Sequence, residues 1–122
     1  MLSFDFIGGY VSANGSFIEY KRNNCRYHAF QLKTTVDNTS LLNQILASLE
    51  INNRVYTYIG PKQSYSKIII RDRNSIINKL IPALEGRIFG YKQGLYIQWK
   101  QAINNSSSMW NFRNIKTTVT QK

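Results

Sequence analysis

Few side chains in this sequence are suited to metal or nucleophilic chemistry. The chain has one cysteine, Cys25, and one histidine, His28, which together cannot supply the four ligands of a usual structural zinc site. A lone cysteine cannot form an internal disulfide either, which is typical of a reducing compartment. The carboxylates that remain for metal binding or acid–base work are Asp5, Glu19, Asp37, Glu50, Asp72 and Glu85. Of these, Asp72 is expected to cap a helix.

Basic and aromatic side chains, in contrast, are abundant. Sixteen Lys and Arg against six Asp and Glu give a formal charge of +10 over 122 residues, together with 8 Tyr, 6 Phe and 2 Trp. Such a surplus on a small body predicts a polyanionic partner. Rings beside cations suit bases beside phosphates, so the partner is expected to be nucleic acid and not a membrane. The longest aliphatic run, residues 68–70, is far below the roughly 18 to 20 residues that span a bilayer.

Hydrophobic periodicity predicts one domain over residues 1–104 and a basic tail over 105–122, with Trp110 and Phe112 as the tail's anchors. The expected elements are, in order, a helix over 2–13, strands over 16–22 and 26–35, a helix over 41–50, strands over 54–59 and 64–71, a helix over 76–84 and a helix over 94–104. Pro82 should kink or shorten the third helix because proline lacks an N–H. The order α-β-β-α-β-β-α-α indicates an α+β fold with antiparallel strands and helices on one face.

The end of the first helix resembles the motif of the LAGLIDADG homing endonuclease family. Residues 7–15 are Ile-Gly-Gly-Tyr-Val-Ser-Ala-Asn-Gly, followed by the usual Ser-Phe pair. The two hairpins, the Leu-rich helix and the later pattern Lys92-x-x-x-Tyr96-x-x-Trp99-Lys100-x-Ala102-Ile103 fall in the family's order, and together they cover about 100 of the 122 residues. The resemblance implies one half of a LAGLIDADG-like fold, in which four antiparallel strands form a saddle.

Small residues within the motif helix predict a close helix contact. Two adjacent glycines in a helix cost about 1 kcal/mol each relative to alanine, which close packing would offset. Gly8 with Ser12, and Gly9 with Ala13, are four apart and predict a packing interface. By resemblance, two such helices pack in a pseudo-twofold assembly, so a homodimer or pairing with another LAGLIDADG-like half is expected. The alternative is that Gly8 and Gly9 interrupt the helix.

The acidic positions of the motif are neutral in this chain. By resemblance, the eighth motif position holds divalent metal over the scissile phosphates, and here it is Asn14; the sixth, also acidic in the consensus, is Ser12. A neutral amide replaces a carboxylate poorly at a Mg²⁺ site, so a pseudoenzyme without a cofactor is expected. Glu19 is the best substitute acid, or else an ion-pair partner of Lys21 or Lys33. Lys92 matches a lysine that the family often keeps near its active site, or else is a solvated loop residue.

Strand alternation predicts which side chains face nucleic acid. The family lays its saddle into the major groove, and aliphatic residues at positions 55, 59, 68 and 70 have the core-facing parity of the second hairpin. The expected nucleic-acid-binding residues of this hairpin are therefore Arg54, Tyr56, Tyr58, Tyr65, Lys67 and Arg71. On the first hairpin the equivalent candidates are Lys21, Gln31 and Lys33, where the parity across the Asn23-Asn24 turn is open. The alternative is an ordinary solvated sheet face.

Three functional hypotheses remain open from the sequence. The first is a catalytically inactive protein that binds double-stranded DNA or structured RNA. The second is an RNA-binding structural component of an organellar ribosome, or a maturase-like splicing cofactor, in a large ribonucleoprotein. The third is a Mg²⁺-dependent site-specific DNA endonuclease whose partner supplies the metal ligands. The 13 Asn and 15 Ile are what AT-rich coding produces, which favours an organellar location, the mitochondrion.

Overall fold

A computed structural model of the protein describes residues 1–105. Its elements are α1 (Phe4–Asn14), β1 (Gly15–Arg22), β2 (Cys25–Thr34), the 3-10 turn η1 (Val36–Asn38), α2 (Thr39–Leu49), β3 (Tyr56–Ile59), β4 (Ser64–Ile70), α3 (Arg73–Ser75), the π turn η2 (Ile76–Leu80), α4 (Ile81–Leu84) and α5 (Tyr91–Asn105). None of the helices in this described part is long and apolar enough to cross a bilayer.

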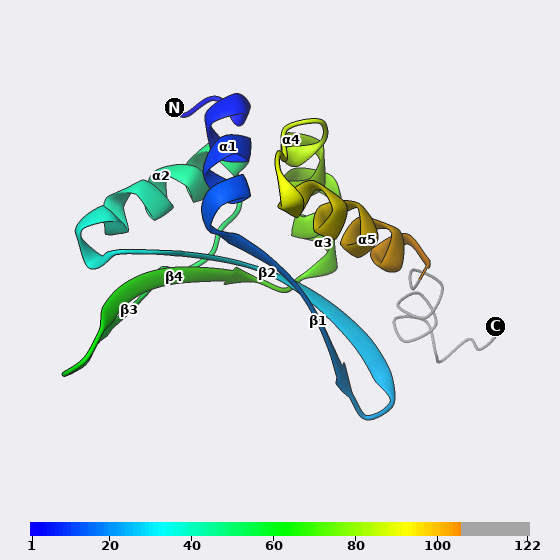
Figure 1. The fold of residues 1–122 in the computed structure, drawn as a ribbon, viewed down its shortest axis with the longest axis horizontal. Coiled ribbons are helices and arrows are strands. Elements are labelled where there is room, and N and C mark those ends of the chain that lie inside the picture. Colours follow the sequence, from blue (N-terminus) through cyan, green and yellow to red (C-terminus); the bar gives the residue numbers. More distant parts are fainter. Residues whose placement is uncertain (106–122) are drawn as a thin grey trace.

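The four strands form one antiparallel sheet in the order β1-β2-β4-β3. All the helices lie on one face of this sheet (Figure 1). The two hairpins extend away from the helices on either side, so that the opposite face is concave and open. The predicted α+β fold, with a saddle-shaped sheet and helices on one face, is confirmed.

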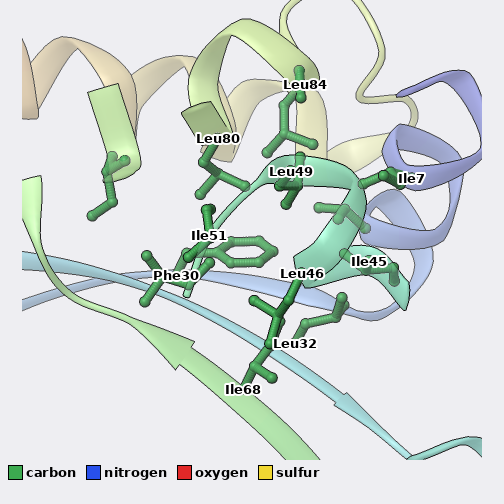
Figure 2. Close-up of a cluster of buried hydrophobic side chains, with 14 of the residues drawn as sticks. Ile7, Phe30, Leu32, Ile45, Leu46, Leu49, Ile51, Ile68, Leu80 and Leu84 are labelled. Atoms are coloured by element: carbon green, nitrogen blue, oxygen red, sulfur yellow. The ribbon is translucent and has the colours of Figure 1, made fainter. Parts of the chain in front are cut away.

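The core lies between the sheet and the helices. Alternate residues of β2 and β4 point toward it: Phe30 pairs with Ile70, and Leu32 with Ile68, all at most 1% exposed. Figure 2 shows Phe30, Leu32 and Ile68 of the sheet in one cluster with Ile7 of α1, Leu46 and Leu49 of α2, and Leu80 and Leu84. Truncating one such buried leucine to alanine costs about 2–5 kcal/mol, so this layer fixes the position of the sheet beneath α1.

Capping and local space set the limits of α1. The helix begins two residues later than expected, because Ser3 is its N-cap and its Oγ accepts a hydrogen bond from the Phe6 N–H at 3.1 Å. It ends at Asn14, before Gly15, as expected. Gly15 has φ −85°, so it is not a left-handed cap. It lies so close to Val11 that a Cβ would be 2.7 Å from the Val11 Cγ1 atom.

The first hairpin has the expected turn. Asn23 and Asn24 have φ of 54° and 65°, and two consecutive positive φ values are typical of a two-residue type I′ turn. Arg22 therefore pairs with Cys25, and the register runs without a slip to Gly15 and Leu32. This register decides which face each side chain of β1 takes.

The third predicted helix is interrupted. Asp72 caps its start, as expected: its Oδ2 accepts from the Ser75 N–H at 2.9 Å. Residues 76–80 then form a π turn, in which the Ile81 N–H donates to the Ile76 carbonyl, and Pro82 follows in the first turn of α4. Proline offers no N–H to an α-helical carbonyl, and the rare π geometry occurs mostly, as here, as a single turn within a helical segment.

The last helix is longer than predicted. It begins at Tyr91, directly after Gly90 with φ +74°, and Gly94 lies inside it, so the expected start at Gly94 is wrong. A single glycine weakens a helix by only about 1 kcal/mol, and buried Tyr96, Trp99 and Ile103 offset that. The helix also includes Asn105, which had been assigned to the tail. The rest of the predicted tail, with Trp110 and Phe112, lies outside the described residues.

Candidate nucleic-acid interface

Basic and aromatic side chains meet on the concave face of the sheet. Lys33, Lys67 and Tyr56 occupy neighbouring positions on β2, β4 and β3, and Tyr58 pairs with Tyr65 in the next row. Their parity is opposite to that of the buried residues of the same strands, so they face away from the helices. The outward placement expected from alternation therefore holds for these residues and for Gln31; their role in binding stays a prediction.

Cations and rings contact one another on this face. The Lys33 Nζ lies 4.6 Å from the centroid of the Tyr65 ring, and the Arg54 guanidinium lies 5.8 Å from that of Tyr56. The rings of Tyr58 and Tyr65 are 5.4 Å apart. Such contacts hold long basic side chains in place without neutralising their charge. The charges therefore stay available to an anion.

The concave face carries no carboxylate at the outward strand positions of the described residues. Of the two acidic residues nearest the strands, Glu19 has the helix-side parity of β1, and Asp72 caps α3. Uncompensated Lys and Arg on a concave surface give a positive potential that attracts polyanions. The arrangement therefore suits a rod-like anion lying across the sheet.

One expected binding residue takes the other face. Lys21 pairs with Arg26 and shares its parity with Phe17, which packs against the core, so Lys21 lies on the helix side of the hairpin. The outward prediction for Lys21 is wrong. The prediction failed because the Asn23–Asn24 turn determines which face of the sheet each β1 side chain takes. The sequence alone left the parity across that turn undetermined.

Glu19 forms an ion pair within the first hairpin. Its Oε2 accepts from the Arg26 guanidinium at 3.2 Å, so the observed partner is neither Lys21 nor Lys33. Four residues of strand separate Glu19 from Gly15, which is roughly 13 Å at the usual rise. Glu19 is therefore too far along β1 to replace an acid at the end of α1.

Buried His28 pairs with Glu19 across the hairpin and is 1% exposed. Burial is the main reason why the pKa of this imidazole lies below its usual value, with a smaller opposing effect of Glu19 and a further lowering by Arg26. His28 is therefore a residue of the fold and has no place on the concave face.

The end of α1 is held by other parts of the chain. The Ser12 Oγ donates to the Gly8 carbonyl and accepts from the Phe89 N–H, both at 2.8 Å. The Lys92 Nζ donates to the Gly15 carbonyl, and Lys92 lies half-buried on α5, so the alternative of a solvated loop lysine is wrong. Within the described part of the chain, the exposed Asn14 amide donates one hydrogen bond, to the Tyr10 carbonyl at 3.3 Å. Asn14 is thus the polar group of the motif that faces outward.

No carboxylate joins Asn14. Among residues 1–105, no group of three or more His, Cys, Asp or Glu side chains could hold a metal ion. Asp5 forms an ion pair with Arg87 at 2.9 Å, and Glu85 with Lys100 at 2.6 Å. The hydrogen bond from Lys100, and then that from Tyr96, hold the pKa of Glu85 below its usual value. The Asp5 and Glu85 carboxylates are therefore engaged in ion pairs within the fold.

The small residues of α1 form two faces, and not one. A Cβ at Gly8 would lie 2.4 Å from the Arg87 Cβ, so this glycine lets the segment after α4 pack against the helix. A Cβ at Gly9 would have no neighbouring atom within 4 Å, and Gly9, like Ala13, is exposed. The helix is continuous, so the alternative of an interruption at the glycines is wrong. The side with Phe6, Gly9 and Ala13 is left open.

The structure also brings residues that alternation had not selected beside the predicted Gln31 and Arg71. A hollow in the concave face is lined by Ile18, Tyr20, Arg22, Ala29, Gln31, Ile69 and Arg71. The ring of Tyr20 lies 5.5 Å from that of Tyr27 on the same face. Half-buried Phe17, which packs against the core, would have indicated this face for Ile18, Tyr20 and Arg22, had the parity of β1 been counted from it.

Comparison with protein families gives one match: the model of the LAGLIDADG endonuclease family matches residues 7–103. The structure of I-GzeII in complex with its DNA target aligns at TM-score 0.73 and 18% identity, over 99% of this chain and 40% of that one. I-LtrWI bound to target DNA aligns at 0.70 and 24%, over 83% and 36%. I-TnaI aligns at 0.72 and 15%, over 84% and 71%. No curated protein matches.

Proposed function

Because the chain belongs to the LAGLIDADG endonuclease family, we propose that it is a nucleic-acid-binding protein that no longer cleaves its target. The observation that carries the proposal is the concave sheet face, with Lys33 and Lys67 at outward positions, Arg71 in the lining of its hollow and, among residues 1–105, no carboxylate at the outward strand positions. Two of the similar structures are described as bound to a DNA target, which supports the same use of the face here.

On this face, the side chains divide into two kinds of contact. Lys33, Lys67 and Arg54 end in flexible cations that bind phosphates and contribute affinity without reading sequence. Gln31 and Arg71 have planar donor groups that can reach base edges. Two of these cations lie over tyrosine rings, Lys33 over Tyr65 and Arg54 over Tyr56. The face thus combines phosphate binding with base recognition.

The loss of cleavage follows from the end of α1. Mg²⁺ in phosphoryl-transfer sites is held by carboxylates and substrate phosphates, and it activates water by its charge. Asn14 offers a neutral amide, and the Ser12 hydroxyl is already shared between Gly8 and Phe89. These residues do not fit a catalytic metal ion, so no cleavage step is assigned to them.

The open side of α1 is the proposed surface for a second subunit. The chain spans about 40% of the length of the first matched structure. Phe6 is 44% exposed, and beside it Gly9 and Ala13 would let another helix backbone approach closely. A second copy of the chain, related by a twofold axis, would cover this surface and extend the concave sheet into a longer one.

The test is a binding and cleavage assay on the whole chain. Affinity for duplex DNA, measured by fluorescence anisotropy from 50 to 300 mM salt, should fall linearly with salt on logarithmic axes, because binding releases counterions. A plasmid library should stay uncut with Mg²⁺ under the conditions in which it is bound. A flat salt response would overturn the binding proposal, and Mg²⁺-dependent cutting by the unmodified chain would overturn the inactivity.

A further inference from the structure

The hollow in the concave face has aliphatic walls and a polar rim. It measures about 510 Å³ and is lined by residues of β1 and β2, and by Ile69 and Arg71 at the end of β4. Ala29 forms its floor: it is 3% exposed and pairs with Ile18 of β1. Because alanine is small, the side chains of the neighbouring rows stand above it. The hollow is thus formed by the register of the sheet.

Two cross-strand neighbours in the hollow differ in chemistry. Gln31 of β2 pairs with Ile69 of β4, so an amide and a branched aliphatic side chain lie side by side. Directly opposed residues in a sheet have Cβ atoms about 4.5–5.5 Å apart. A single ligand edge that carries a hydrogen-bonding group and a methyl group could contact both of these side chains.

We propose that this hollow recognises an A·T base pair in the major groove of double-stranded DNA, with the adenine edge on Gln31 and the thymine methyl group against Ile69. A glutamine amide pairs with the N6 and N7 atoms of adenine, and the C5-methyl of thymine is the one apolar group that bases present in that groove. This inference rests on the proposed function, and it names the base that the same face selects.

The side chains that line the hollow favour duplex DNA over RNA as its ligand. Uracil lacks the methyl group, and the major groove of an RNA helix is too deep and narrow for side chains to enter. Recognition of unpaired bases relies on stacking on rings. Tyr20 is the single ring among the residues that line the hollow, and the remaining apolar lining is aliphatic: Ile18, Ala29 and Ile69. Arg22 and Arg71 are exposed at the rim, where they can reach phosphates or a neighbouring guanine.

The experiment begins by selecting duplexes from a random DNA library with the full-length chain, and sequencing those that bind. Each thymine of the selected site is then replaced singly by deoxyuridine, which removes only the methyl group. At one position the affinity should fall about fourfold, the value expected for one buried methyl group. In Ile69→Ala the same replacement should change the affinity little, and Gln31→Ala should relax the preference for A·T there.

Ile59→Ala is the matched control. Ile59 is an isoleucine of the neighbouring strand β3, is 75% exposed and does not line the hollow, so this variant should keep the fourfold loss. Ile69→Val, which removes only one methyl group, provides a second test should Ile69→Ala fold poorly, as judged by its thermal unfolding, and it should reduce the fourfold loss. Insensitivity of the unmodified chain to every deoxyuridine replacement, or tighter binding to structured RNA than to the selected duplex, would overturn the inference. Absence of binding to any nucleic acid would instead overturn the proposed function.

Discussion

At the residue scale, the chain uses neutral side chains where its family has acids, and these side chains have local tasks. Ser12 joins α1 to Phe89, and Asn14 hydrogen-bonds the preceding turn. Lys92 binds the Gly15 carbonyl, where the partial negative charge of the helix end favours a cation. The end of the motif helix is thus stabilised by charge and hydrogen bonding within the chain.

The two motif glycines should respond in opposite ways to substitution by alanine. Gly8→Ala should destabilise the fold, because the new Cβ would lie 2.4 Å from the Arg87 Cβ. Gly9→Ala should stabilise it by up to ~1 kcal/mol, since the position is open and alanine is the better helix former. Urea unfolding at concentrations where the chain is monomeric measures both. Equal effects of the two substitutions would contradict the packing of Gly8 against Arg87.

His28 should make stability depend on pH. Burial lowers its pKa in the folded chain, so below pH 6.5 the unfolded chain binds a proton that the folded chain does not. The free energy of unfolding should therefore fall as pH drops from about 7 toward the lowered pKa, with a slope of up to about 1.4 kcal/mol per pH unit.

Unfolding of the His28→Gln variant by urea at pH 7, 6 and 5 is the comparison. Its stability should vary less over this range than that of the unmodified chain. Glu85 provides a contrast within the same protein. Its pKa is lowered from 4.5, so the stability that it contributes is lost only in more acidic solution. An unchanged pH profile in the variant would show that His28 does not titrate as its burial implies.

At the element scale, α1 has two partners on two sides. Its buried side packs on the core through Ile7 and Val11, and its Gly8 side meets the segment between α4 and α5. The remaining side, with Phe6, Gly9 and Ala13, has no partner among the described residues. These three are spaced by three and four residues, so they lie in one row along the helix.

Ala13→Glu should weaken self-association. In a twofold assembly through α1, the two introduced carboxylates would approach each other, and like charges in a desolvated contact are unfavourable. Sedimentation equilibrium over a range of protein concentrations measures the change. Asn43→Glu on the exposed side of α2 introduces the same charge and should leave association unaltered. Equal association of the two variants would exclude α1 as the subunit contact.

At the scale of the whole molecule, charge is distributed unequally between the two faces of the sheet. The acids that have partners, Asp5, Glu19 and Glu85, pair with basic residues on the helix side. On the concave side, Lys33 and Lys67 contact tyrosine rings and no carboxylate. In the described part of the chain, the concave face therefore carries basic side chains that have no acidic partner there.

Lys67→Gln and Lys21→Gln should separate the two faces. Both remove one positive charge, but only Lys67 lies on the concave side. Lys67→Gln should reduce the slope of log affinity against log salt by about 0.9, the value for one lost phosphate contact. Lys21→Gln should leave the slope nearly unchanged. Salt titrations of both variants on one duplex give the comparison, and a larger effect of Lys21→Gln would place the nucleic acid on the other face.

Local patterns were enough to identify the family, the element order, both hairpins and the neutral residues at the motif's acidic positions. Each of these depends on neighbours in the chain: alternation places Lys33 and Lys67, and the asparagine pair encodes its own turn. Other features arose only through contacts between distant segments. Gly8 differs from Gly9 because Arg87 packs on one of them, and the hollow exists because Ile18, Ala29 and Ile69 come from three strands. Such contacts depend on how the layers pack, and short-range periodicity carries no information about that.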